Sequence, residues 1–165
     1  MSSVKELICL SQTCKTLNHA VNCYRRAAFN FPAIVQPFIG YQDVGSLQQL
    51  LEKTEGVISG STALQYLDRV RFKTSDLDIY ISAQRCAEAS DWLLEHGMKK
   101  KANSDDKIGH GTDSTIGYTG ITEVDHIEEF EVSISGRTVQ LIATKHHPVL
   151  AILRFHSCTH SLFVR

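Results

Sequence analysis

The sequence predicts an α/β (α+β) fold, and three observations support this prediction. Residues 56–82 read as an apolar strand, a Gly-Ser turn, a helix and a second strand. Residues 130–144 alternate between apolar and polar side chains on either side of a Gly-Arg pair, which is typical of a β-hairpin. Apolar residues in the range 4–29 recur mostly every three or four positions, which favours a helix.

Composition excludes several classes of protein. The 165 residues are 42% hydrophobic and 21% charged, which is usual for one soluble globular domain. The formal net charge of −1 provides no overall basic field for binding nucleic acid. The chain lacks the roughly 20-residue apolar run that spans a bilayer, so we do not expect a membrane among its binding partners. Five cysteines without small-domain spacing indicate reduced thiols and a cytoplasmic or nuclear location.

The N-terminal quarter is predicted to be a helical segment followed by a connector, spanning residues 1–41 and packed on the domain of residues 42–165. The helix covers residues 4–29, and a break near Ser11 would divide it into two. Pro32, Pro37 and Gly40 then predict a loop or extended connector over residues 30–41.

Three further helices follow from capping signals. Asp43 or Ser46 can cap a helix that leads into the central unit. Ser82 can cap a helix over residues 83–96, in which Cys86 is expected to be a small buried hydrophobe. Pro148 is favourable in the first turn of a helix near the end of the chain.

The range 98–118 is predicted to be a surface loop, because lysines, polar residues and glycines dominate it. Its basic run, residues 99–101, has a second interpretation as a lid whose lysines reach substrate phosphates. Residues 121–129 are acidic and their structure is left open by the sequence.

Two aspartates in the central unit suggest chemistry. Asp76 and Asp78 alternate with apolar residues, so both point to one side of a strand, where their charges repel. Mg²⁺ or Mn²⁺ prefers oxygen ligands of this kind, together with substrate phosphates. Gly60 and Ser61 precede a helix, whose N-terminal N–H groups attract phosphate. Taken singly, each residue is also an ordinary cap or surface residue.

This order of features resembles the signature of the nucleotidyltransferase superfamily, the DNA polymerase beta-like fold. The signature is an apolar strand, Gly-Gly or Gly-Ser, a spacer and Asp-x-Asp; here the spacer is slightly longer than typical. Fungal proteins with the same Gly-Ser and Asp-x-Asp unit look similar over most of the chain, and such domains often continue further. The resemblance implies a small mixed β-sheet flanked by helices, with Asp76 and Asp78 as catalytic metal ligands and Gly60 and Ser61 as nucleotide-binding residues.

The resemblance also implies a reaction. A metal-dependent enzyme of this family transfers a nucleotidyl group from a nucleoside triphosphate to an acceptor hydroxyl, which here is unknown. The family usually has a third carboxylate on a later strand, where this sequence has Gln140. Glutamine is neither an anionic ligand nor a general base, although Glu131 could substitute. The alternative is therefore an inactive binding or adaptor module with the same fold.

Two weaker patterns leave other functions open. Residues 7–30 resemble the end of an F-box, which would imply a protein partner for the N-terminal helix, although the leading Leu-Pro segment is missing. His156, Cys158 and His160 would share one face of a terminal strand and, with His146 or His147, could bind zinc in an interaction domain.

Overall fold

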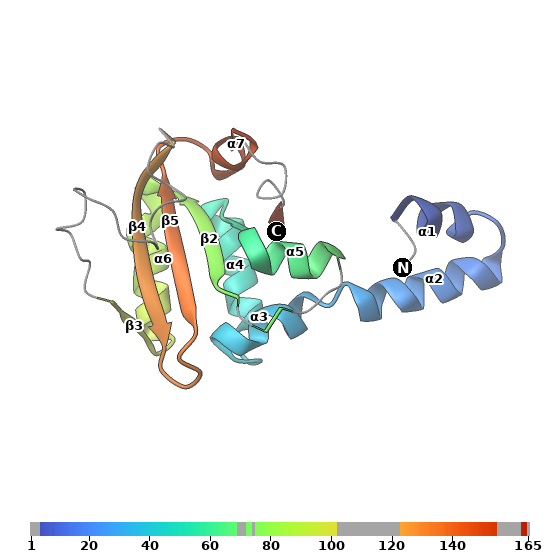
Figure 1. Cartoon of the computed structure of the whole chain (residues 1–165), viewed down its shortest axis with the longest axis horizontal. Coiled ribbons are helices and arrows are strands. Elements are labelled where there is room, and N and C mark those ends of the chain that lie inside the picture. The colour runs from blue at the N-terminus through green and yellow to red at the C-terminus, as the bar shows by residue number, and fades with distance from the viewer. Residues whose placement is uncertain (1–3, 69–71, 74, 102–122, 155–162, 165) are drawn as a thin grey trace. The chain divides into compact units, whose positions relative to one another are not determined.

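The computed structural model describes residues 4–68, 72–73, 75–101, 123–154 and 163–164 (Figure 1). The chain divides into two compact units, Met1–Phe31 and Pro32–Arg165. Among the described residues, no helix is both long and apolar enough to cross a bilayer.

The first unit contains two helices, α1 (Val4–Ser11) and α2 (Lys15–Ala28). The predicted break near Ser11 is confirmed. The Asn18 side-chain amide donates to the Ser11 carbonyl at 3.0 Å, and the Thr13 hydroxyl donates to the Leu10 carbonyl at 2.7 Å. These bonds satisfy polar groups at the end of α1, where helical carbonyls lose their partners.

Helix α3 (Phe31–Ile39) belongs to the second unit from Pro32 onward, so the prediction of a loop or extended connector was wrong. Pro32 occupies the first turn of the helix, where its missing N–H costs nothing. Pro37 lies inside α3, which removes one helical hydrogen bond. The buried side chains of Val35 and Phe38 offset that loss, and Gly40 ends the helix with a φ of 75°.

The described strands form one six-stranded mixed sheet in the order β3-β4-β5-β2-β1-β6, which confirms the expected mixed sheet. β2 and β5 are parallel, and every other neighbouring pair is antiparallel. The strands are β1 (Val57–Ser59), β2 (Leu77–Ser82), β3 (Met98–Lys100), β4 (Val124–Val132), β5 (Thr138–Thr144) and β6 (Phe163–Val164).

Helices α4 (Val44–Thr54) and α6 (Cys86–Glu95) belong to the apolar side of the sheet. That face presents buried Ile79 and Leu141, which are neighbours on β2 and β5. A short 3₁₀ turn, η1 (Ala83–Arg85), leads from β2 into α6, which runs alongside the strands (Figure 1). The Trp92 indole N–H donates to the Ser46 hydroxyl at 2.8 Å and joins α6 to α4.

The other face of the sheet is partly apolar and partly polar. Helix α7 (Pro148–Leu153) covers a small core of Val57, Tyr80, Ile142 and Ile152, all of which are buried. Helix α5 (Gly60–Asp68) connects β1 to β2 and contacts both. The polar end of this face lies beyond the small core and contains Asp78.

Most predicted elements are present, with one further correction. The helices before and after the central unit, the hairpin and the terminal helix are confirmed. Lys99 and Lys100 lie in strand β3 rather than in a loop, because Met98 and Lys100 pair with Val132 and Phe130 of β4. The range 102–122 lies outside the described residues.

Candidate functional site

The predicted aspartates lie at the start of the central strand β2. Asp78 pairs with Ser59 of β1 and with Gln140 of β5, and Gln140 in turn pairs with Glu129 of β4. Residues opposite one another in such a row point to the same face of the sheet. Asp76 is exposed just before the first residue of β2, and the strand period places it on the face that Asp78 uses.

Gly60 brings the N-terminus of α5 against Asp78. A Cβ atom on Gly60 would lie 1.9 Å from Asp78 Oδ2, so the carboxylate occupies the space that any other residue would fill. Gly60 also has a φ of 69°, which disfavours side chains. Positive φ and close approach therefore both require glycine, and together they place the Asp78 carboxylate beside the positive end of a helix dipole.

Two hydrogen bonds fix α5 relative to the segment before β2. The hydroxyl of buried Thr62 donates to the Asp76 carbonyl at 2.7 Å. The Gln65 side-chain oxygen accepts from the Phe72 N–H at 3.0 Å. The spacing between the Gly-Ser turn and the two aspartates is thus held by contacts of the described residues, although four residues of the intervening segment, 69–71 and 74, lie outside that description.

The electrostatics of this site favour a cation. Burial, and to a smaller extent the nearby charge of Asp76, raises the pKa of Asp78 to about 7. Among the described side chains, no lysine, arginine or histidine forms an ion pair with either aspartate. Two neighbouring carboxylates that form no ion pair with a described basic side chain could hold a divalent cation. We refer to Gly60, Ser61, Asp76 and Asp78 as the aspartate site.

Gln140 is the direct β5 neighbour of Asp78, so the row contains no carboxylate at that position. The next residue of the row is Glu129 rather than Glu131. Glu131 pairs with Thr138 and is exposed, whereas Glu129 is half-buried, with its carboxylate 4.0 Å from Lys101 Nζ. Glu129 is therefore the carboxylate that the sheet aligns with Asp78, two strands away.

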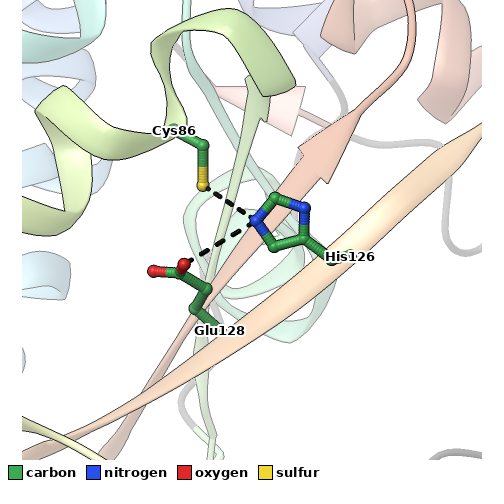
Figure 2. Close-up of side chains that lie close together, drawn as sticks. All are labelled: Cys86, His126 and Glu128. Carbon is green, nitrogen blue, oxygen red and sulfur yellow. Dashed lines mark hydrogen bonds and ion pairs between the residues drawn. The ribbon is translucent and has the colours of Figure 1, made fainter. Parts of the chain in front are cut away.

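A second cluster lies on the opposite face of the sheet and can hold a metal ion (Figure 2). Cys86 begins α6, while His126 and Glu128 lie two residues apart on β4. Their ligand atoms all lie within 4.8 Å of one another. Cys86 Sγ is 3.5 Å from His126 Nε2, which is 3.7 Å from Glu128 Oε1. We call these three residues the thiol cluster.

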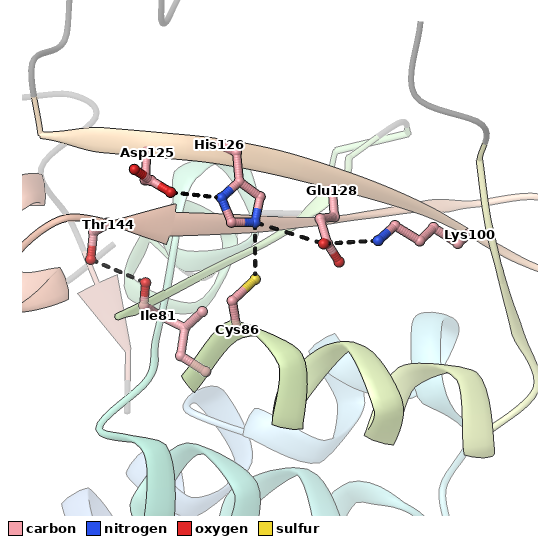
Figure 3. A network of polar contacts seen from close by, with 7 residues as sticks. All are labelled: Ile81, Cys86, Lys100, Asp125, His126, Glu128 and Thr144. Atoms are coloured by element: carbon pink, nitrogen blue, oxygen red, sulfur yellow. Dashed lines mark hydrogen bonds and ion pairs between the residues drawn. The ribbon is translucent and has the colours of Figure 1, made fainter. Parts of the chain in front are cut away.

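Two charged residues surround the thiol cluster (Figure 3). Asp125 Oδ2 accepts from His126 Nδ1 at 2.9 Å, and Lys100 Nζ lies 2.8 Å from Glu128 Oε1. Glu128 Oε2 is buried and makes no hydrogen bond to the described residues. Burial raises the pKa of the Cys86 thiol to about 11, with smaller contributions from Glu128 and from Asp125 that exceed the opposing effect of Lys100.

Sequence reasoning missed the thiol cluster. The prediction that Cys86 is a small buried residue is confirmed, but its hydrogen bond to His126 joins positions forty residues apart. The available signal was His126 and Glu128 at a spacing of two, which places both on one face if the segment is a strand. The sequence does not decide between strand and loop for residues 121–129.

Other candidate residues lie apart from these sites or outside the described ranges. Lys100 and Lys101 are tied to the sheet, since Lys101 Nζ donates to the Thr138 hydroxyl at 3.2 Å. His147 caps α7 by accepting from the Val149 N–H at 3.2 Å. The terminal residues of the predicted zinc pattern are outside the description: His156, Cys158 and His160.

The second unit also has an open groove of about 570 Å³ between α4 and α6. It is lined by residues such as Lys53, Glu88 and Trp92, and it contains neither the aspartate site nor the thiol cluster. No family model, curated protein or solved structure matches this chain. The interpretation of both sites therefore rests on their own geometry.

Proposed function

We propose that the chain is a metal-dependent nucleotidyltransferase that binds a nucleoside triphosphate with Mg²⁺ or Mn²⁺ at the aspartate site. One observation supports this above all others: the Asp78 carboxylate packs against Gly60 at the N-terminus of α5, beside a second carboxylate. This arrangement joins an anion-binding helix end to a pair of cation ligands. Phosphoryl chemistry needs both, because it depends mainly on positioning and charge neutralisation.

Each residue has a distinct role in this proposal. Gly60 and Ser61 present the N-terminus of α5 to the phosphates, and only glycine at position 60 leaves room for Asp78. Asp78 and Asp76 are the oxygen ligands, and Mg²⁺, when bound, supplies charge neutralisation for the triphosphate. The attacking hydroxyl belongs to an acceptor that this site does not identify. Free thiols at Cys9, Cys14, Cys23 and Cys86 agree with a cytoplasmic or nuclear setting.

A second candidate function follows from Gln140. Its position directly beside Asp78 gives the site an amide where a third carboxylate would bind a second ion or accept the proton of the attacking hydroxyl. A chain of this kind can bind a nucleotide and one ion without transferring a group. Such a module would act as a nucleotide-dependent binding or adaptor protein.

Calorimetric titration with each nucleoside triphosphate and Mg²⁺ tests the shared part of both functions. We expect saturable binding by the wild type and its loss in the Asp76→Asn/Asp78→Asn double variant. Asp68→Asn is the matched control, because this exposed carboxylate lies at the other end of α5. Absence of binding by the wild type, or equal binding by the double variant, would exclude the proposed site.

Transfer of a labelled nucleotidyl group then separates the two candidates. Label that becomes covalently attached to a protein, nucleic-acid or small-molecule hydroxyl, and that disappears with Asp78→Asn, supports the enzyme. Binding with the same metal dependence but without transfer to any of the three acceptor classes supports the binding module.

A further inference from the structure

We propose that Cys86, His126 and Glu128 form a binding site for Zn²⁺ or a similar thiophilic divalent ion, with one coordination position open to solvent. This site is independent of the proposed nucleotide function. Glu128 shares the sheet face of Leu141 and Ile79, whereas Asp78 points to the opposite face. The donor set also differs, because sulfur and imidazole ligands select zinc-like ions over Mg²⁺.

The spacing of the ligand atoms agrees with tetrahedral coordination. Zinc bonds of about 2.3 Å to sulfur and about 2.0–2.1 Å to nitrogen or oxygen place ligand atoms about 3.4–3.6 Å apart. Cys86 Sγ and His126 Nε2 are 3.5 Å apart, and His126 Nε2 and Glu128 Oε1 are 3.7 Å apart. The remaining pair, Cys86 Sγ and the Glu128 carboxylate, lies within 4.8 Å, so rotation of these side chains can bring all three ligand atoms onto one ion.

Asp125 orients the His126 ring so that Nε2 can act as a metal ligand. A carboxylate accepts hydrogen bonds, so the 2.9 Å contact to Asp125 Oδ2 places the ring proton on Nδ1 of neutral His126. Nε2 then has the lone pair, and Figure 3 shows that this atom faces Cys86 and Glu128. A carboxylate behind a ligating histidine is the usual support of protein zinc sites. Asp125 is therefore a positioning residue rather than a ligand.

Glu128 has coordination capacity that the protein does not use fully. Its Oε2 atom is buried and unpartnered among the described residues, which is costly for a carboxylate oxygen. Its Oε1 atom is near Lys100 Nζ, but the Lys100 side chain is 39% exposed and can move into water. In the metal-free protein, Lys100 thus supplies part of the positive charge that an ion would supply.

Binding requires the transfer of one proton. With Nδ1 of His126 protonated, the Cys86 thiol donates its S–H to Nε2. When the ion binds, the S–H bond breaks, sulfur forms its bond to the metal, and the proton passes to solvent. The fourth position is left to water, because the His126 side chain is 44% exposed and the cluster provides three ligands. The ion would join the start of α6 to β4.

Cobalt(II) and zinc titrations of a protein with one thiol test this proposal. Cys9, Cys14, Cys23 and Cys158 are replaced by serine, which leaves Cys86 as the single cysteine of the chain. We expect one Co²⁺ per chain, a thiolate-to-cobalt charge-transfer band, and displacement of Co²⁺ by Zn²⁺ with a dissociation constant of about 1 µM or tighter. Cys86→Ala on this background must lose the band.

Variants at partly exposed positions show whether a loss of zinc binding comes from the site itself rather than from unfolding. His126→Gln should fold, because the side chain is 44% exposed, and should weaken zinc binding at least about tenfold. Asp125→Asn should weaken it about 10–100-fold while retaining the thiolate band, as a positioning residue would. Lys100→Met should tighten binding by removing the competing cation.

The chain also contains a matched control. Cys23 Sγ and His19 Nε2 on α2 are 3.5 Å apart, the same distance as in the thiol cluster, but they do not belong to a described group of three ligands. In a background that keeps the other four cysteines, Cys23→Ser should leave tight zinc binding unchanged. The proposal is overturned if the single-thiol protein shows no thiolate band, or if His126→Gln binds zinc as tightly as its parent.

Discussion

The two faces of the central sheet concentrate negative charge in different ways. At the aspartate site, Asp76 and Asp78 repel one another, and burial raises the pKa of Asp78 to about 7. At the thiol cluster, Lys100 Nζ lies 2.8 Å from Glu128 Oε1 and partly compensates the charge of that carboxylate. Among the described residues, no basic side chain forms an ion pair with the carboxylates of the first site, whereas Lys100 forms one with the carboxylate of the second. Hard and soft ions would accordingly have separate places on one sheet.

Of the substitutions considered, replacement of Gly60 should have the largest effect, because it should impair the aspartate site and leave the thiol cluster intact. Gly60→Ala forces a Cβ into the space of Asp78 Oδ2 and strains a φ of 69°. We expect nucleotide binding to weaken at least about a hundredfold and the free energy of unfolding to fall by about 1–3 kcal/mol. Zinc binding at the thiol cluster should be unchanged. Calorimetric titration and denaturant unfolding measure these effects.

Substitutions at two other glycines distinguish the effect of backbone strain from the effect of the contact with Asp78. Gly97 has a φ of 80° but open space around it, so Gly97→Ala reports backbone strain alone, about 1 kcal/mol. Gly45 lies in α4 with no atom near its Cβ position, so Gly45→Ala should stabilise the helix by about 0.5–1 kcal/mol. Equal loss of nucleotide binding in Gly97→Ala and Gly60→Ala would contradict the role of the Asp78 contact.

Asp78→Asn should stabilise the metal-free protein at neutral pH while it abolishes binding. The raised pKa means that the folded state holds this proton more tightly than the unfolded state, whose aspartate has a pKa near 3.8. Stability therefore falls as pH rises from about 4 to about 7, and the loss is complete above about 7. We expect a gain of roughly 1–3 kcal/mol at pH 8, which allows for partial solvent screening.

Unfolding curves between pH 4 and 8 check this prediction, with Asp68→Asn as control. The wild type should show a decline in stability that Asp78→Asn lacks and that Mg²⁺ reduces. Parallel pH profiles for the wild type and Asp78→Asn would mean that Asp78 is not the group that titrates.

Gln140→Asp should add negative charge to the face of the sheet that contains the aspartate site, and so increase its difference in charge from the other face. A third carboxylate beside Asp78 adds repulsion in the metal-free protein and a ligand for cations. We expect Mg²⁺ to bind about tenfold more tightly, which corresponds to about 1.4 kcal/mol, and any nucleotidyl transfer to increase. Gln140→Asn is the neutral control of matched size. If both variants bind Mg²⁺ equally, charge at this position does not govern the site.

Lys100→Met should have the smallest effect on folding. Loss of the Lys100–Glu128 contact leaves the mostly buried carboxylate without its partly exposed cation and should cost about 0.5–1 kcal/mol in the metal-free protein. Added Zn²⁺ should restore more than this loss. Lys99→Met is the control, because Lys99 is exposed and pairs with Glu131 on the other face. Thermal unfolding with and without zinc distinguishes the two variants.

The local features of this fold could be predicted from the sequence. The Gly-Ser turn, the α5 helix and the strand with Asp76 and Asp78 lie close together in the chain, so short-range patterns were sufficient. The loop assigned to residues 30–41 was wrong because proline and glycine signals outweighed the apolar residues, although Pro32 suits a first helical turn. Burial of Val35 and Phe38 then decided the outcome.

The distant contacts could not be predicted in the same way. Cys86 meets His126 only because α6 and β4 pack on one sheet face, and no local pattern specifies that packing. Similarly, Glu129 rather than Glu131 is aligned with Asp78 because β4 pairs with β5 in one particular register. A register shift of one residue would reverse the face of both glutamates.

The parallel pairing of β2 with β5 also determines the order in which the aspartate site can assemble. β1, α5 and β2 are consecutive, so Gly60 and Asp78 can meet as soon as this short unit forms. Leu77 and Val139, by contrast, are joined across about sixty residues, and closing such a loop delays contact. During synthesis on a ribosome, the edge of β2 that pairs with β5 would therefore remain unpaired until β5 had been synthesised. A nascent chain would acquire its aspartates early and Gln140 last.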